Sequence, residues 1–220
     1  MRHPRPAALP PLKGENQVMQ AKLDLRIRQL HEAIGQVRTA DLAAVHPRAS
    51  IVGDLYYVRV NFSDGASDAQ LANNVSLFVA NIACLKDHLK AWCKAHNKPF
   101  HGDTLIDSNR DVGIIHDLWN RDKHFHLKKS RTRLFPEIRN VSRAARLSTQ
   151  AQTGSWVAMT LDPRTGQLRT HGDGKVELVI DADVVDSTGA RLGGLIEIAE
   201  RAIAEWEIAL AAAGVAVPPR

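Results

Sequence analysis

Several signatures that would assign a function directly are missing from this sequence. Its 220 residues contain no run of 18 apolar residues, which excludes a helix that crosses a membrane. There is no Walker A loop, no G-x-G-x-x-G after a strand, no G-x-S-x-G and no H-E-x-x-H. The motifs of P-loop NTPases, dinucleotide-binding enzymes, α/β-hydrolases and zinc proteases are therefore absent. The 44% hydrophobic and 24% charged residues are the composition of an ordinary globular protein.

Cysteine is scarce, and a secretion signal is missing. On one helix, Cys84 and Cys93 would lie about 13 Å apart, too far for a disulfide bond, which fits a reducing compartment. We therefore expect a cytoplasmic protein without a membrane partner. The N-terminus is basic and proline-rich and lacks the apolar segment of a signal peptide. We expect a disordered tail over 1–15 and a single α+β domain over 16–214.

Hydrophobic periodicity predicts both helices and strands. Apolar residues three and four positions apart predict helices over 16–39 and 68–96, from about residue 107 onward, and over 189–213. Alternation of apolar and polar residues predicts strands over 50–62, 156–161 and 175–180. We therefore expect an α+β fold, in which a helical bundle carries a small antiparallel β-meander inserted before the C-terminal helix.

Positive charge is concentrated in one part of the chain. The net charge is +5, and nine lysines and arginines fall between positions 121 and 146, against only Asp122 and Glu137. Such a stretch is either a solvated face or a surface that contacts phosphate groups. It begins inside the segment with the highest density of reactive side chains, which reads IHDLWNRDKHFHLKK over 115–129.

Within this segment, Arg121, followed by Asp122 and then by His126, resembles the motif of the HEPN superfamily (higher eukaryote and prokaryote nucleotide-binding domains). In that motif an arginine is followed directly by a polar residue and, a few residues later, by a histidine. The resemblance implies a helical bundle and a metal-independent endoribonuclease without a cofactor. It also implies a homodimer that pairs two motifs, RNA as a partner, and a toxin or defence role.

A second resemblance concerns the same helix. A group of bacterial proteins of unassigned function pairs a long helix, matched here by ANIACLKDHLKAW over 80–92, with a later N-x-x-K-H. Asn120, Lys123 and His124 match that later pattern. We expect these three residues, together with His116, to support the site or to contact the RNA backbone.

The residue types suit RNA cleavage through the 2′-hydroxyl. His126 would act as acid or base, because an unperturbed imidazole titrates near neutral pH. Arg121 would bind the scissile phosphate through its guanidinium fork, and Asp122 would orient it. On an ideal helix, positions 121 and 126 are about 140° apart, so one motif alone does not converge on one phosphate. A second copy across a two-fold axis would supply the missing partner.

Three other interpretations remain open. Arg110, Asp111 and His116 form a second arginine–polar–histidine set. Alternatively, the polar face of this helix would pair with a stripe of Asn74, Asn81 and His88 and form a buried structural layer. The protein would then be a non-catalytic binding or assembly module whose protein partner is unknown. A metal site would draw on His116, Asp117, His124 and His126. We favour the site without a metal.

Overall fold

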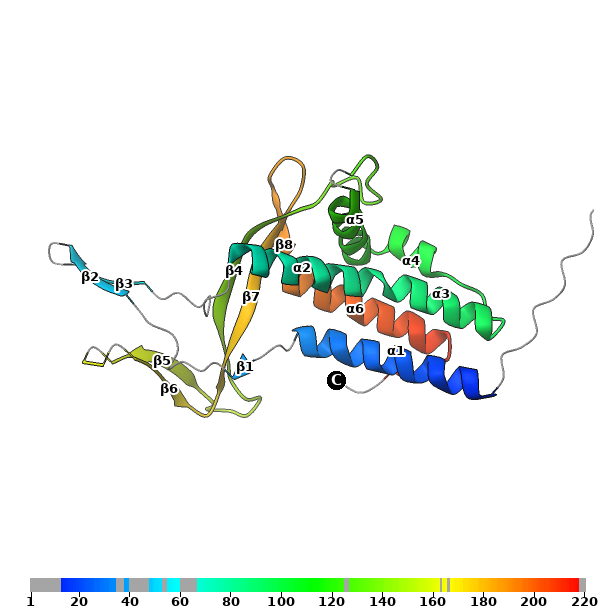
Figure 1. Ribbon diagram of the computed structural model, residues 1–220. Helices are drawn as coiled ribbons and strands as arrows, with labels where there is room; N and C mark the ends of the chain where they lie inside the picture. The colour runs from blue at the N-terminus through cyan, green and yellow to red at the C-terminus, as the bar shows by residue number, and fades with distance from the viewer. Residues whose placement is uncertain are drawn as a thin grey trace, which may run out of the picture. The chain divides into compact units, whose positions relative to one another are not determined.

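The computed structural model describes residues 13–34, 38–39, 48–52, 55–59, 67–124, 127–162, 164–165 and 167–217. These residues form helices and antiparallel sheets, which confirms the α+β class. The helices are α1 (Lys13–Ile34), α2 (Asp68–Ala83), α3 (Leu85–Ala95), α4 (Gly102–Ser108), α5 (Arg110–His124) and α6 (Leu195–Ala212) (Figure 1). The strands are β1 (Arg38–Thr39), β2 (Arg48–Val52), β3 (Leu55–Arg59), β4 (Glu137–Ser148), β5 (Val157–Leu161), β6 (Leu168–Gly172), β7 (Lys175–Val185) and β8 (Arg191–Gly194).

The chain divides into two compact units. We call the first, built from ranges 1–31, 77–136 and 197–220, the helical unit. The second, built from ranges 32–76 and 137–196, is the strand unit. None of the helices in the described ranges is long and apolar enough to cross a membrane. The single domain expected over 16–214 stays a prediction.

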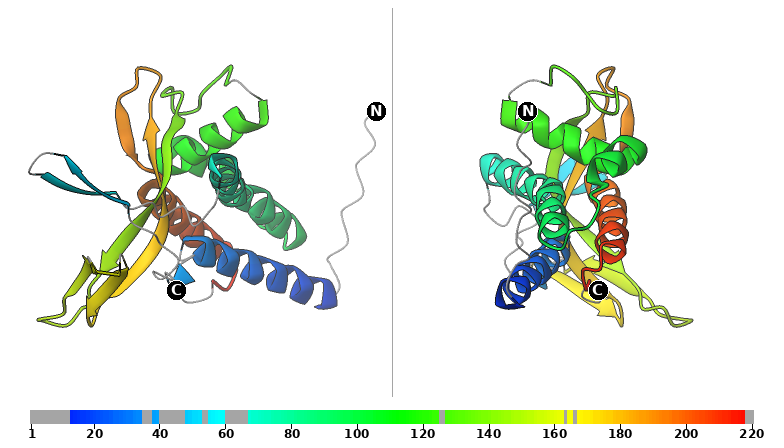
Figure 2. Two further views of the ribbon diagram at one scale, coloured as in Figure 1. Left: turned by 60° about the vertical axis from the view of Figure 1, so that its left-hand side comes forward. Right: turned by 90° about the vertical axis from the view of Figure 1, so that its right-hand side faces the viewer.

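The core of the helical unit comes from the predicted apolar stripes. In this unit α1, α3 and α6 run side by side (Figures 1 and 2). Each helix buries residues at spacings of three and four, namely Leu23, Ile27 and Leu30 on α1, Leu85, Leu89 and Trp92 on α3, and Ala199, Ile203, Trp206 and Leu210 on α6. Burial of one large apolar side chain contributes about 1.5–3 kcal/mol, so these stripes hold the unit together.

The long helix predicted over 68–96 is interrupted once. Cys84 forms a turn between α2 and α3, although its own backbone stays helical at φ −67° and ψ −14°. The buried stripe therefore continues through the turn from Ile82 to Leu85. Both cysteines are free, as expected.

The strand unit is centred on β7. Strand β4 pairs with it on one side, while β1 and β8 pair with it on the other, all antiparallel (Figure 2). Strands β2 and β3 form one separate hairpin, and β5 and β6 form another. Because β4 pairs with β7 and not with the next strand in the chain, the sheet is not a simple meander.

Several boundaries differ from those expected. The strand predicted over 50–62 is a hairpin, and residues 191–194 form β8 where a helix was predicted. Helix α6 begins only at Leu195, after Gly193 and Gly194, because glycine is a poor helix former. At its other end Gly214 takes a φ of 76°, a left-handed value that ends a helix as predicted.

Candidate functional site

Helix α5 carries residues 115–124 of the reactive segment, and a side chain caps its first turn. Asn109 caps it, since the Asn109 side-chain oxygen accepts hydrogen bonds from the backbone N–H groups of Asp111 (3.0 Å) and Val112 (3.1 Å). The predicted inward residues Val112, Ile115 and Leu118 are all buried. The last residue of the helix is His124. The polar residues of 116–124 are thus carried by a helix fixed in the core.

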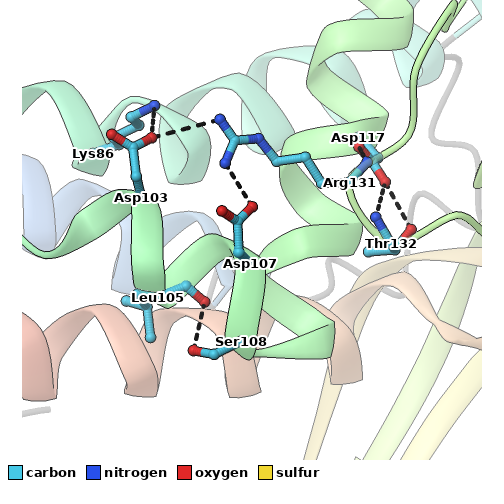
Figure 3. Close-up of polar contacts among 8 residues, drawn as sticks. All are labelled: Lys86, Asp103, Leu105, Asp107, Ser108, Asp117, Arg131 and Thr132. Carbon is cyan, nitrogen blue, oxygen red and sulfur yellow. Dashed lines mark hydrogen bonds and ion pairs between the residues drawn. The ribbon is translucent and has the colours of Figure 1, made fainter.

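Asp117 anchors residues 130–132 of the segment that follows helix α5. Its side chain is fully buried, and its carboxylate accepts four hydrogen bonds from three consecutive residues. Figure 3 shows the two that Thr132 donates. The donors are Ser130 Oγ (2.6 Å), Arg131 N (2.9 Å), Thr132 N (3.0 Å) and Thr132 Oγ1 (2.7 Å). Such a fully hydrogen-bonded carboxylate fixes the return of the chain along α5.

Two further features hold the same segment. The Arg131 guanidinium lies 2.7 Å from Asp107 and 3.5 Å from Asp103 on α4, and Asp103 also pairs with Lys86 on α3 at 2.6 Å (Figure 3). Thr132 lies against Gly113, where an added Cβ would come within 2.8 Å of Thr132 Cγ2. A glycine at position 113 therefore allows the close approach of the segment to the helix.

A pocket of about 480 Å³ opens where α5 ends and the segment returns. Its lining residues in the described part of the chain are Asn120 and His124 from the helix and Leu127, Lys128 and Lys129 from the segment. Two lysines, an imidazole and an amide give this pocket cationic and hydrogen-bonding groups, and no carboxylate is among these lining residues. It is therefore suited to an anion such as a phosphate group.

The remaining predicted residues are placed differently. Arg121 is partly exposed and Asp122 is exposed on α5, and neither lines the pocket. The exposed Lys123 has its Nζ 5.2 Å from the ring centre of Trp119. Phe125 and His126 lie outside the described residues, so the role of His126 stays a prediction.

His116 is buried, with 3% of its surface exposed. Its ring lies edge-on to Trp119 at 6.0 Å and tilted to Trp206 at 6.2 Å between centres. Its Nε2 atom has no hydrogen-bond partner among the described residues. Burial, assisted by the charges of Lys86 and Arg131, lowers the pKa of His116 to about 4. In this position His116 packs in the core and is not among the lining residues of the pocket.

This burial predicts a pH dependence of stability. Because the pKa of His116 is about 4 in the folded chain and 6.5 without burial, the unfolded chain binds more protons between these values. Stability is then full above about pH 6.5 and falls by roughly 3 kcal/mol as the pH drops toward 4. Urea titrations at several pH values measure this, with His116→Phe expected to flatten the dependence and His101→Phe, at an exposed position, expected to leave it unchanged. An equally steep dependence in His116→Phe would contradict the assignment.

The structure also places the residues of the three alternative interpretations. Asp111 of the second arginine–histidine set is engaged by Arg201, at 2.6 Å and 3.3 Å, and the histidine of that set is the buried His116. For the proposed polar layer, Asn74 is exposed, while Asn81 and His88 are partly exposed. Within the described ranges no group of three side chains is placed to hold a metal ion.

The sequence places Lys128 and Lys129 in the basic stretch but does not predict that they line a pocket, and the structural role of Asp117 was missed. The sequence signal for this role was an aspartate next to Ile114, Ile115 and Leu118, because a carboxylate on an apolar helix face needs hydrogen-bond donors.

Comparisons of the chain with protein-family models, with curated proteins and with solved structures give no match.

Proposed function

We propose that this protein is a metal-independent endoribonuclease whose site lies at the C-terminal end of α5. One observation carries the proposal: Asn120 and His124, two of the residues expected to support the site, line a pocket together with Lys128 and Lys129. These are the groups that contact RNA phosphates. The lining residues of the pocket are also neighbours in sequence of Arg121, Asp122 and His126, the residues of the HEPN-like motif.

The electrostatics of the pocket favour a polyanion. The C-terminal end of a helix carries a partial negative charge of about one half, which alone disfavours phosphate. Lys128 and Lys129 bring two full positive charges to the same end of α5. The positive charge of the two lysines exceeds the partial negative charge of the helix end, so the pocket attracts phosphate groups at low and moderate salt.

In the proposed reaction, the RNA supplies its own nucleophile. The 2′-hydroxyl oxygen attacks the neighbouring phosphorus while the bond from phosphorus to the 5′-oxygen breaks, which leaves a 2′,3′-cyclic phosphate and a 5′-hydroxyl. A base takes the 2′-hydroxyl proton, an acid gives one to the 5′-oxygen, and His126 fills one of these roles. Arg121 stabilises the negative charge that builds on the phosphate oxygens, with Asp122 orienting its guanidinium. The second copy of a homodimer would supply the other proton-transfer group.

The test is cleavage of a labelled RNA, and of DNA of the same sequence, by purified protein in excess EDTA. We expect the RNA to be cut and the DNA to stay intact, since DNA lacks the 2′-hydroxyl. Arg121→Ala is expected to abolish the cleavage, while the matched change Arg110→Ala at the start of the same helix is expected to preserve it. Cleavage that requires added magnesium, manganese or zinc would replace this proposal with a metal-dependent nuclease.

A second candidate is a non-catalytic binding or assembly module. It is favoured by the buried positions of His116 and Asp117, which give part of the polar face of α5 a structural role. In that case the purified protein binds RNA or a protein partner at the pocket but does not cut RNA under any metal condition. The same assay therefore separates the two functions.

A further inference from the structure

We propose that the pocket at the end of α5 is a binding subsite for a phosphate of the RNA backbone other than the one that is cleaved, and that Asp117 positions its lysines. This inference rests on the proposed RNA substrate but not on cleavage. The argument begins with the lining of the pocket. Lys128 and Lys129 line it, whereas Arg121 and Asp122, which would act on the scissile phosphate, do not.

The helix places the elements of the subsite on one face. Asn120 and His124 follow Asp117 by three and seven positions, so all three side chains lie within about 60° around the helix axis. Residues 127–132 run back along this face, because residues 130–132 are hydrogen-bonded to Asp117 near the middle of α5. Residues 127–129, which directly precede them, are therefore held beside Asn120 and His124, where they line the pocket.

The position of the two lysines thus depends on a residue that does not touch the ligand. Lysine side chains are long and flexible, and the conformational entropy that they lose when a ligand fixes them reduces the free energy of binding. The Asp117 hydrogen bonds fix the backbone immediately after Lys129, and the ion pairs of Arg131 with Asp103 and Asp107 fix it from the side of α4. Asp117 is accordingly a positioning residue for the subsite.

The test measures binding of a short 2′-O-methyl oligoribonucleotide to the full chain by fluorescence anisotropy. This probe cannot be cut through its 2′-position, so binding is read whether or not the protein is a ribonuclease. We expect Lys128→Ala with Lys129→Ala to raise the Kd about tenfold and to make the log–log salt dependence less steep by about 1. On a cleavable RNA, the same variant is expected to raise KM and to leave kcat nearly unchanged.

The role of Asp117 is tested by a double-mutant cycle. Asp117→Asn is expected to raise the Kd about tenfold in the wild-type background and by less than about twofold in the double lysine variant. Equal weakening in both backgrounds would show that Asp117 acts through general stability, and no weakening in a folded Asp117→Asn protein would exclude positioning. Should Asp117→Asn fail to fold, Thr132→Val removes one donor to Asp117 and takes its place in the cycle, with an expected increase in Kd of about threefold.

Two other outcomes concern the subsite itself. A wild-type chain that does not bind the oligonucleotide overturns the subsite, whatever the cleavage assay gives. A wild-type chain that binds it through the two lysines but does not cut RNA keeps the subsite and overturns the ribonuclease. The two proposals therefore fail separately.

Discussion

Replacing Asp117 by alanine should lower the free energy of unfolding by about 3–5 kcal/mol. The substitution leaves Ser130 Oγ, Arg131 N, and the N and Oγ1 atoms of Thr132 without the acceptor that they share. A polar group that is buried without a partner costs about 1–3 kcal/mol, and water reaches only part of this segment. Urea unfolding followed by tryptophan fluorescence and circular dichroism measures the change.

The control for this prediction is Asp122→Ala, which removes an exposed carboxylate from the same helix. Its expected effect is within about 1 kcal/mol, because exposed carboxylates contribute little. The account of the Asp117 hydrogen bonds is wrong if the two alanine variants are equally stable.

Replacing His126 by alanine should slow RNA cleavage on the order of 10²- to 10⁴-fold, the usual contribution of a general acid or base. The reason is chemical: without a proton donor or acceptor, the 2′-oxygen attacks or the 5′-oxygen leaves with an unfavourable charge. Initial rates on one RNA in excess EDTA, for wild type and variant at equal concentration, measure it. His101→Ala, at an exposed position before α4, is the matched control and should cut at the wild-type rate.

A further variant makes this prediction more specific. His124→Ala removes the histidine that lines the pocket and is expected to weaken RNA binding more than it slows the bound reaction. If instead His124→Ala abolishes cleavage and His126→Ala does not, the acid or base is His124. In that case the HEPN-like motif does not describe this site.

The apolar stripes are the part of the fold that the sequence predicts best. A buried face at spacings of three and four follows directly from helix geometry, and Leu23, Ile27, Ile203 and Trp206 are buried as predicted. The interruption at Cys84 leaves the stripe intact and so leaves no trace in the hydrophobic pattern. Strand β4 was missed because its arginine-rich sequence EIRNVSRAARLS lacks a regular alternation, which a bulge between Arg139 and Ser142 disturbs further.

The sequence predicts where the basic residues cluster along the chain, but not which contacts each of them makes. The basic stretch over 121–146 looks uniform in the sequence, yet the structure assigns its members to different tasks. Lys128 and Lys129 line the pocket, Arg131 pairs with carboxylates of α4, and Arg139 lies on β4 in the strand unit. Likewise, a ligand-type residue such as Asp117 is recognised as structural only when its donors, 13 to 15 positions later in the chain, are known.

The ends of the cleaved RNA test the central claim most directly. After incubation with the wild-type protein in excess EDTA, the account predicts fragments with 2′,3′-cyclic phosphate and 5′-hydroxyl ends, and at least about 100-fold fewer of them from His126→Ala in the same time. Fragments with 5′-phosphate and 3′-hydroxyl ends would contradict it, because water and not the 2′-hydroxyl would then be the nucleophile. Equal amounts of cyclic-phosphate ends from both proteins would also contradict it, since His126 would then have no part in the reaction.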